Sequence, residues 1–267
     1  MSEELKAQLV GAYRAAFDAW LDAVADLDAD AWSAPTGCPG WDVHDQLAHV
    51  VSLEREMLGD PPDAIRLPDD LPHVTNPYGE HVEVGVQARR GVPAPALVSE
   101  ARATFERRLV DLGHLDPNAL GEPMAGPAGT KMKASRMLRT RIFDITTHEH
   151  DVRRAVQRPS DGVGHHVTIA TELVLRSWAA LLPDRLGHEG VLAIDLADRG
   201  RATIDLADGT LHRGSAGPEA TARIAVTPNQ LLAIGGGRSD APTIDHLDAQ
   251  GDEDLVARLL THGSVTP

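Results

Sequence analysis

The chain has 267 residues, of which 42% are hydrophobic and 24% are charged, a composition typical of a globular protein with one large or two modest domains. Its 40 acidic residues outnumber the 25 basic ones, and the resulting formal charge of −15 repels nucleic acids and anionic membranes. Aromatic residues make up only 3% of the chain, so few rings are available to stack on bases. We therefore expect neither nucleic-acid binding nor membrane binding.

The single cysteine, Cys38, excludes an internal disulfide. The first residues, M-S-E-E-L-K, are charged and lack the apolar core of a signal peptide. No stretch of the sequence approaches the uninterrupted apolar length that is needed to span a bilayer. We therefore expect a cytoplasmic protein.

The first part of the chain has the apolar spacing of helices. Asp42 suits a helix N-cap, and Asp45 three residues later favours the positive end of the same helix. Pro- and Gly-rich segments separate the periodic ones. The pattern predicts a helical bundle with helices over residues 3–28, 42–58, 78–90, 96–112 and 132–156, and with loops at 60–76 and 121–130.

After residue 159 the pattern changes, although one more helix is predicted over 165–182. The stretches V-L-A-I-D-L-A-D, R-A-T-I-D-L-A-D-G and A-T-A-R-I-A-V alternate with period two, which indicates strands of an antiparallel sheet. Two helical patterns follow, near 228–235 and 252–262. We predict an all-α helical bundle over 1–160 and a smaller α+β domain with an antiparallel sheet over 161–267.

Three side chains on two predicted helices could form a metal site. His49 lies beside the apolar stripe of its helix, in T-G-C-P-G-W-D-V-H-D-Q-L-A-H-V. Asp144 and His148 lie four residues apart on the flank of the last helix of the bundle, in R-I-F-D-I-T-T-H-E-H-D-V-R-R-A. Two imidazoles and one carboxylate match a catalytic divalent site with an open position, in which zinc or another borderline ion fits.

The same residues have a simpler interpretation. A histidine at the edge of an apolar stripe is often a core residue, an Asp-x-x-x-His pair can be a hydrogen bond, and H-E-H-D is not the zincin motif. Asp151, three residues after His148, could be a fourth ligand or a partner that orients a ring. The pattern alone leaves these alternatives open.

The two quoted motifs, with W-S-A-P before the first and V-Q-R-P after the second, resemble the mycothiol-dependent maleylpyruvate isomerase-like family of actinobacteria. That family belongs to the DinB-type superfamily of metalloenzymes. The resemblance covers the whole chain and implies a metal-binding DinB-like four-helix bundle followed by a domain similar to sterol carrier protein 2. It implies His49, Asp144 and His148 as metal ligands. The family is expected to have Glu at the middle ligand, and the shorter Asp144 leaves the identity of the substrate open.

The resemblance also implies cofactors and a reaction class. The cofactors are a divalent metal ion, with zinc expected, and mycothiol. A thiol beside a divalent cation loses its proton readily, and the thiolate can isomerise a small electrophile such as maleylpyruvate or be transferred to it. We expect a monomer or a homodimer with small-molecule partners only.

Other polar residues are candidates for supporting roles. Arg238, in G-G-G-R-S-D, could bind a substrate carboxylate, or it could be an ordinary turn residue. Arg141 could contact substrate or neutralise a buried acid. Glu54 and Glu149 point into apolar stripes and need either an arginine partner or a proton-transfer role. Cys38 is most simply a small filler before its helix.

Two rival functions are compatible with the sequence. In the first, the protein would be a non-catalytic binding module. It would hold a structural metal with four protein ligands, Asp151 included, and would have an apolar ligand cleft in the second domain. In the second, the protein would be a hydrolase in which Glu54 or Glu149 serves as a general base.

Overall fold

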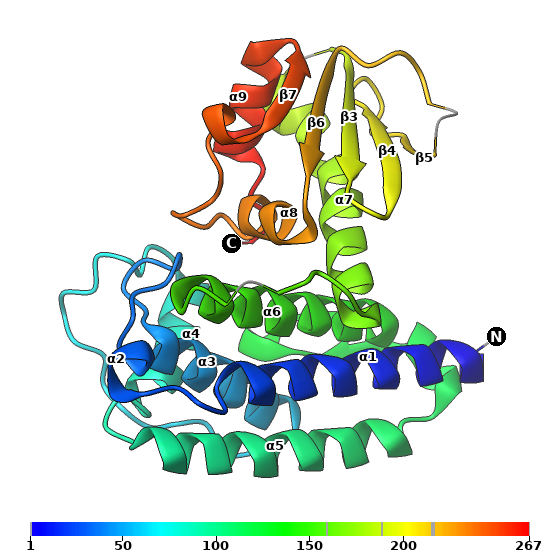
Figure 1. Ribbon diagram of the computed structural model, residues 1–267. Coiled ribbons are helices and arrows are strands. Elements are labelled where there is room, and N and C mark those ends of the chain that lie inside the picture. The colour runs from blue at the N-terminus through cyan, green and yellow to red at the C-terminus, as the bar shows by residue number, and fades with distance from the viewer. Residues whose placement is uncertain (1, 159, 188, 215–216, 267) are drawn as a thin grey trace. The chain divides into compact units, whose positions relative to one another are not determined.

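The computed structural model describes residues 2–158, 160–187, 189–214 and 217–266 (Figure 1). These residues form two compact units. The first comprises residues 2–158 and 163–170, and the second comprises residues 160–162 and 171–266.

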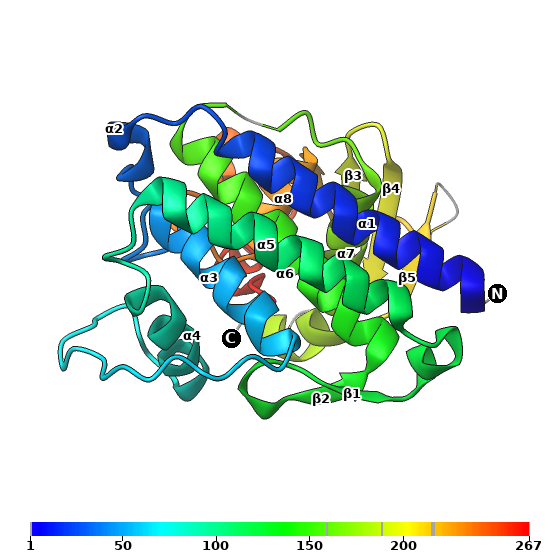
Figure 2. The ribbon, with the colours of Figure 1, turned by 90° about the horizontal axis from the view of Figure 1, so that it is seen from below.

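Four long helices form a bundle in the first unit (Figure 2). Each of them contacts two others, in the closed order α1, α6, α3, α5 and back to α1. Their bounds are α1 (Ser2–Ala23), α3 (Val43–Met57), α5 (Ala94–His114) and α6 (Ala134–Ala155). A further helix, α4 (Pro77–Gln87), packs against α3. The predicted helical bundle is thus confirmed.

Aliphatic side chains and a few rings fill the core of the bundle. Phe17 stacks on Phe105 with their ring centroids 4.0 Å apart, which joins α1 to α5. Trp20 donates its indole N–H to the carbonyl oxygen of Ile145 at 2.8 Å, which joins α1 to α6. All four residues are at least 98% buried. This core fixes the helices that carry the candidate site.

The first predicted helix is too long, and the reason is local. The structure ends α1 at Ala23 and starts a short helix, α2 (Ala29–Trp32), six residues later. The side chain of Asp28 accepts a hydrogen bond from the backbone N–H of Ala31 and so caps α2, which breaks the continuous helix predicted to residue 28. The predicted cap at Asp42 is confirmed, because its side chain accepts from the N–H of Asp45 at 2.9 Å.

The loop predicted at 121–130 contains regular structure. A small antiparallel hairpin joins two three-residue strands, with 3-10 turns before it and between its strands. Strands of this length are too short for an alternating pattern to be recognised. The bounds are η1 (Pro117–Gly121), β1 (Pro123–Ala125), η2 (Pro127–Gly129) and β2 (Lys131–Lys133).

The second unit contains a five-stranded sheet in the order β5-β4-β3-β6-β7. The bounds are β3 (Val191–Leu196), β4 (Gly200–Asp205), β5 (Leu211–Arg213), β6 (Ala222–Val226) and β7 (Asp248–Gly251). Neighbouring strands are antiparallel except β3 and β6, which are parallel because the chain returns, after β5, to the end of the sheet at which β3 begins. The predicted α+β class is confirmed, and the parallel pair is the feature that the period-two pattern did not reveal.

Helices accompany this sheet. They are α7 (His165–Leu186), which begins in the first unit, α8 (Pro228–Gly235), the 3-10 turn η3 (Ile244–His246) and α9 (Glu253–His262). Both α8 and α9 contact β6. Thr227 and Gln230 form a reciprocal capping box at the start of α8.

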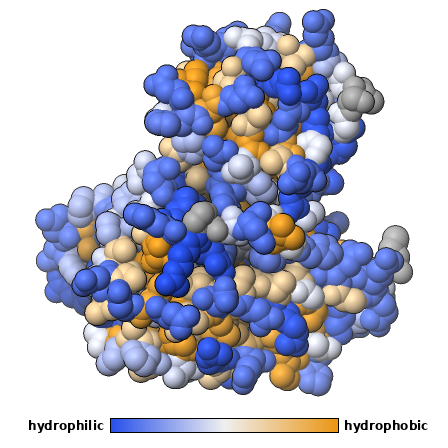
Figure 3. Space-filling model, viewed as in Figure 1, coloured by the Kyte–Doolittle hydropathy of each residue, from blue (hydrophilic) through white to orange (hydrophobic). Residues whose placement is uncertain are grey.

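Hydrophilic side chains dominate the face of the molecule seen in Figure 3, with apolar side chains in small groups between them. Among the described helices, none has both the length and the apolar character to cross a membrane.

Candidate metal centre

The three predicted ligands meet where α3 packs against α6. His49 projects from α3, and Asp144 and His148 lie one turn apart on α6. The Nε2 atom of His49 is 3.4 Å from Oδ2 of Asp144, and Nε2 of His148 is 3.6 Å from Oδ1 of the same carboxylate. One potential ligand atom from each residue lies within 4.8 Å of the others. The structure therefore brings together three side chains that are up to 99 residues apart in sequence.

This donor set fits a divalent ion. Around a tetrahedral zinc ion, neighbouring nitrogen and oxygen ligands are about 3.3–3.5 Å apart, close to the two contacts measured here. Both ring nitrogens of His49 are buried and lack a hydrogen-bond partner among the described residues. An unsatisfied buried imidazole is costly, and coordination would satisfy it.

Electrostatics prepare the same groups for coordination. Burial lowers the pKa of His49 to about 4, despite the opposing effect of Asp144, so its ring is neutral at neutral pH. Burial alone would raise the pKa of Asp144, but Arg141 and the two histidines hold it well below its usual range. Metal ligands must be deprotonated, and both groups meet this requirement.

A series of buried ion pairs orients the carboxylate of Asp144. Arg141 donates Nη1–H to Oδ2 of Asp144 at 2.8 Å and Nε–H to Oε1 of Glu54 at 2.8 Å. Arg108 donates Nε–H to the other oxygen of Glu54 at 3.1 Å. Glu54, Arg141 and Arg108 are all at most 2% exposed. Of the two roles that the sequence left open for Arg141 and Glu54, this geometry supports an internal ion pair for each.

The other nitrogen of His148 is also engaged. Its Nδ1 atom contacts Oε1 of Gln46, a fully buried amide on α3, and lies 3.5 Å from Oδ2 of Asp151. Because an amide oxygen only accepts, Nδ1 is the donor, and the lone pair of the ring belongs to Nε2, which faces Asp144. Asp151 therefore lies on the side of the ring away from the candidate centre and is not a fourth ligand of the same ion.

Sequence reasoning missed Gln46, although it lies three residues before His49 on the same helix. We predict that Gln46→Met, which keeps the side-chain length but removes the acceptor, lowers metal affinity by about 10- to 100-fold. Competition with a chelator of known affinity measures this change, and Gln8→Met on the exposed surface of α1 is the control. Equal affinities of the two variants would show that Gln46 only fills space.

Trp41 forms a half-buried wall of the centre that the sequence did not indicate. Its indole ring lies 4.9 Å from the ring of His49 and 5.9 Å from that of His148, between centroids. The indole N–H donates to the buried carboxylate of Glu83 at 2.8 Å. The preceding Gly40 has φ +79, and a Cβ there would lie 2.3 Å from a ring atom of His73, so the turn that presents Trp41 requires glycine.

A second aromatic side chain, Tyr78 at the start of α4, is half-buried near the carboxylate of Asp144. Burial and then the charge of Asp144 raise the pKa of Tyr78 to about 12, so its phenol stays protonated. The helix can approach α3 closely because Gly85 has no side chain, and a Cβ there would lie 1.9 Å from Oγ of Ser52.

The remaining candidates lie elsewhere. Glu149 pairs with Arg153 and lies 3.4 Å from Nε2 of His150. Cys38 is half-buried, and its Sγ is 3.6 Å from Oδ2 of Asp151. Arg238 belongs to the second unit, where its Nη1–H donates to the carbonyl oxygen of Gly236 at 2.7 Å; its role stays a prediction.

Comparison with known proteins identifies the family of the chain. Residues 13–153, which include all three candidate ligands and more than half of the chain, match the family described as the mycothiol maleylpyruvate isomerase N-terminal domain. The chain belongs to this family. The predicted resemblance is thus confirmed, and the family's defining region coincides with the bundle that carries the centre.

Solved structures with the same fold include mycothiol-dependent maleylpyruvate isomerases. A crystal structure of a mycothiol-dependent maleylpyruvate isomerase matches with a TM-score of 0.55 and 16% identity, covering 89% of this chain and 91% of that one. A histidine-to-alanine mutant of a mycothiol-dependent maleylpyruvate isomerase matches with a TM-score of 0.55 and 14% identity, covering 92% of each chain. A search of curated proteins found no match.

Proposed function

We propose that the chain is a divalent-metal-dependent enzyme that uses mycothiol to isomerise a small electrophilic acid such as maleylpyruvate, or to transfer the thiol to such a substrate. The observation that carries this proposal is the convergence of His49, Asp144 and His148 on one point of the bundle. Family membership and the names of the structural neighbours supply the thiol and the substrate class.

A divalent ion held by these three residues would lower the pKa of a thiol beside it, so that the thiol reacts as a thiolate at neutral pH. The thiol would supply a nucleophile for a cis double bond conjugated to a carbonyl. Addition, rotation about the resulting single bond and loss of the thiolate would give the trans isomer, whereas retention of the carbon–sulfur bond with protonation of the adjacent carbon would give the transfer product.

The chain's own residues orient and insulate these partners. Arg141 engages Oδ2 of Asp144, which leaves Oδ1 turned toward His148. Asp144 stands where the resemblance implies Glu, and its shorter side chain would hold an ion closer to α6. Trp41 packs beside both histidine rings and shields them on one side.

The rival functions receive less support. A structural metal closed by four protein ligands would need Asp151 on the same side of His148 as Asp144, and it lies by the opposite ring nitrogen. A hydrolase would need an available general base, whereas Glu54 is bonded by two arginines, Glu149 pairs with Arg153, and both carboxylates are buried.

Metal removal tests the proposal. Dialysis against a chelator should abolish mycothiol-dependent turnover, and stoichiometric Zn²⁺ or another divalent ion should restore it, because in this proposal the ion is what lowers the pKa of the thiol. The assay uses a panel of small cis-enoic acids with and without mycothiol. Turnover that survives chelation, or that is equal without the thiol, would contradict the proposal.

We also propose that Arg238 binds a substrate carboxylate. Arg238→Ala should lower kcat/KM on an acidic substrate about 10- to 100-fold, the value of a charge-assisted hydrogen bond, with unchanged metal content. Steady-state kinetics and elemental analysis measure both, and Arg66→Ala, at a side chain that is 85% exposed, is the control. Kinetics equal to those of the control would make Arg238 a turn residue only.

A further inference from the structure

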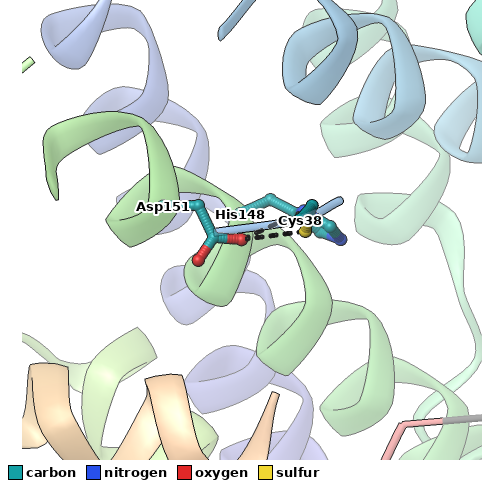
Figure 4. A group of neighbouring side chains, drawn as sticks. All are labelled: Cys38, His148 and Asp151. Atoms are coloured by element: carbon teal, nitrogen blue, oxygen red, sulfur yellow. Dashed lines mark hydrogen bonds and ion pairs between the residues drawn. The ribbon is translucent and has the colours of Figure 1, made fainter. Parts of the chain in front are cut away.

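The second ring nitrogen of His148 faces a separate set of metal-binding atoms. Oδ2 of Asp151 lies 3.5 Å from Nδ1 of His148 and 3.6 Å from Sγ of Cys38, and the three groups offer ligand atoms within 4.8 Å of one another. Figure 4 shows one carboxylate oxygen turned toward both partners. Sulfur, nitrogen and oxygen ligands of a tetrahedral zinc ion are about 3.3–3.6 Å apart, so these contacts have the right length.

We propose that Cys38, Asp151 and Nδ1 of His148 form a second metal-binding set, selective for thiophilic ions such as Cd²⁺ and Cu⁺, which competes with the first set for His148. The first set offers two nitrogens and an oxygen and has no sulfur. A thiolate ligand selects soft ions, so the two sets differ in the metals that they prefer.

Neighbouring charges orient the ligands of this second set. Asp151 is fully buried, and Arg154 donates Nη2–H to its Oδ1 at 2.6 Å, which leaves Oδ2 as the oxygen directed at Cys38. Cys38 itself is a half-buried residue in the turn before α3. The positive charge of Arg154 offsets the negative charge of the Asp151 carboxylate, so the thiolate of Cys38 is the ligand whose charge compensates a bound cation.

Binding at this set excludes binding at the first. The ion replaces the thiol proton of Cys38, which leaves to solvent, and the ring proton of His148 moves from Nδ1 to Nε2. The contact with Gln46 is then lost, and Nε2 becomes a donor toward Asp144 instead of a ligand. One neutral imidazole thus serves one set at a time, and Gln46 favours the first.

Cobalt(II) titration distinguishes the two sets, because a cobalt–thiolate bond gives a near-ultraviolet charge-transfer band that nitrogen and oxygen ligands do not. His49→Ala disables the first set and leaves the second intact, so one equivalent of Co²⁺ should produce the full band. Cys38→Ser should bind Co²⁺ without the band. His49→Ala/His148→Ala should lose at least nine-tenths of the band at the same metal concentration, with far-ultraviolet circular dichroism confirming the fold of each variant.

The outcomes are decisive in either direction. No charge-transfer band in His49→Ala, or an equal band when His148 is also replaced, would overturn the second set. These spectra do not depend on turnover, so they stand whether or not the proposed function is correct. If it is correct, Cd²⁺ should inhibit wild-type turnover at a concentration at least tenfold lower than it inhibits Cys38→Ser, and equal inhibition would count against competition between the sets.

Discussion

Replacement of His49 by alanine is expected to abolish mycothiol-dependent turnover, with a loss of at least about 1,000-fold in kcat/KM. The physical reason is that the remaining pair, Asp144 and His148, lies on one helix and offers only two ligands from one side. A divalent ion held by two ligands dissociates readily, because each protein ligand contributes to affinity. His49 supplies the only ligand of the set that comes from α3.

Metal content is best measured in the Cys38→Ser background, so that an ion bound through sulfur is not counted. There, His49→Ala should leave less than a tenth of the parent's Zn²⁺ at one equivalent of added metal, by elemental analysis after gel filtration. His44→Ala, five residues earlier on the same helix and bonded to the carbonyl oxygen of Val92, is the matched control and should keep its metal. Full occupancy after the loss of His49 would remove it from the centre.

The second large effect concerns stability. Glu54→Gln should lower the free energy of unfolding by about 3–5 kcal/mol, because it leaves Arg141 and Arg108 buried without the carboxylate that both of them share. The neutral amide has nearly the same shape, so packing changes little and the loss reports on charge. Arg141 would then have Asp144 as its remaining close counter-charge, which should also weaken metal binding.

Urea unfolding followed by tryptophan fluorescence measures this change, since three of the four tryptophans, Trp20, Trp32 and Trp41, lie in the first unit. The control is Asp69→Asn, which breaks an ion pair with Arg66 whose side chains are 85% and 89% exposed. That pair should contribute at most about 0.5 kcal/mol. If Glu54→Gln were as mild as the control, the buried charges would be compensated in another way.

These two predictions separate metal binding from the stability of the bundle. Loss of His49 should remove the metal and the activity but leave the apo bundle folded, because the side chain makes no hydrogen bond to the described residues that the fold would lose. Loss of the Glu54 charge should destabilise the bundle even without metal. Urea midpoints of both variants as apo proteins test this separation directly.

The sequence by itself determined most of the local structure of the bundle. Apolar spacing located the helices, and the carboxylate of Asp42 fixed the start of α3, because periodicity and capping involve only residues within one turn of each other. The proximity of Asp144 and His148 also follows from helix geometry alone. At Asp28 a local competitor was overlooked, and the predicted end of the first helix was therefore wrong.

Tertiary structure decided everything that joins separate elements. The contact of His49 with Asp144 spans nearly a hundred residues and depends on the rotation of α3 against α6, which apolar spacing restricts to a face but does not fix. Packing of α3 against α6 and α5 gave Glu54 its two arginines, and packing of α3 against α6 placed Gln46 at one nitrogen of His148. In the second unit, the parallel pairing of β3 with β6 likewise depends on the return of the chain, since a strand's own pattern does not name its neighbour. The types of side chain identified the candidate residues in the sequence, whereas packing between distant elements determined which of their atoms face one another.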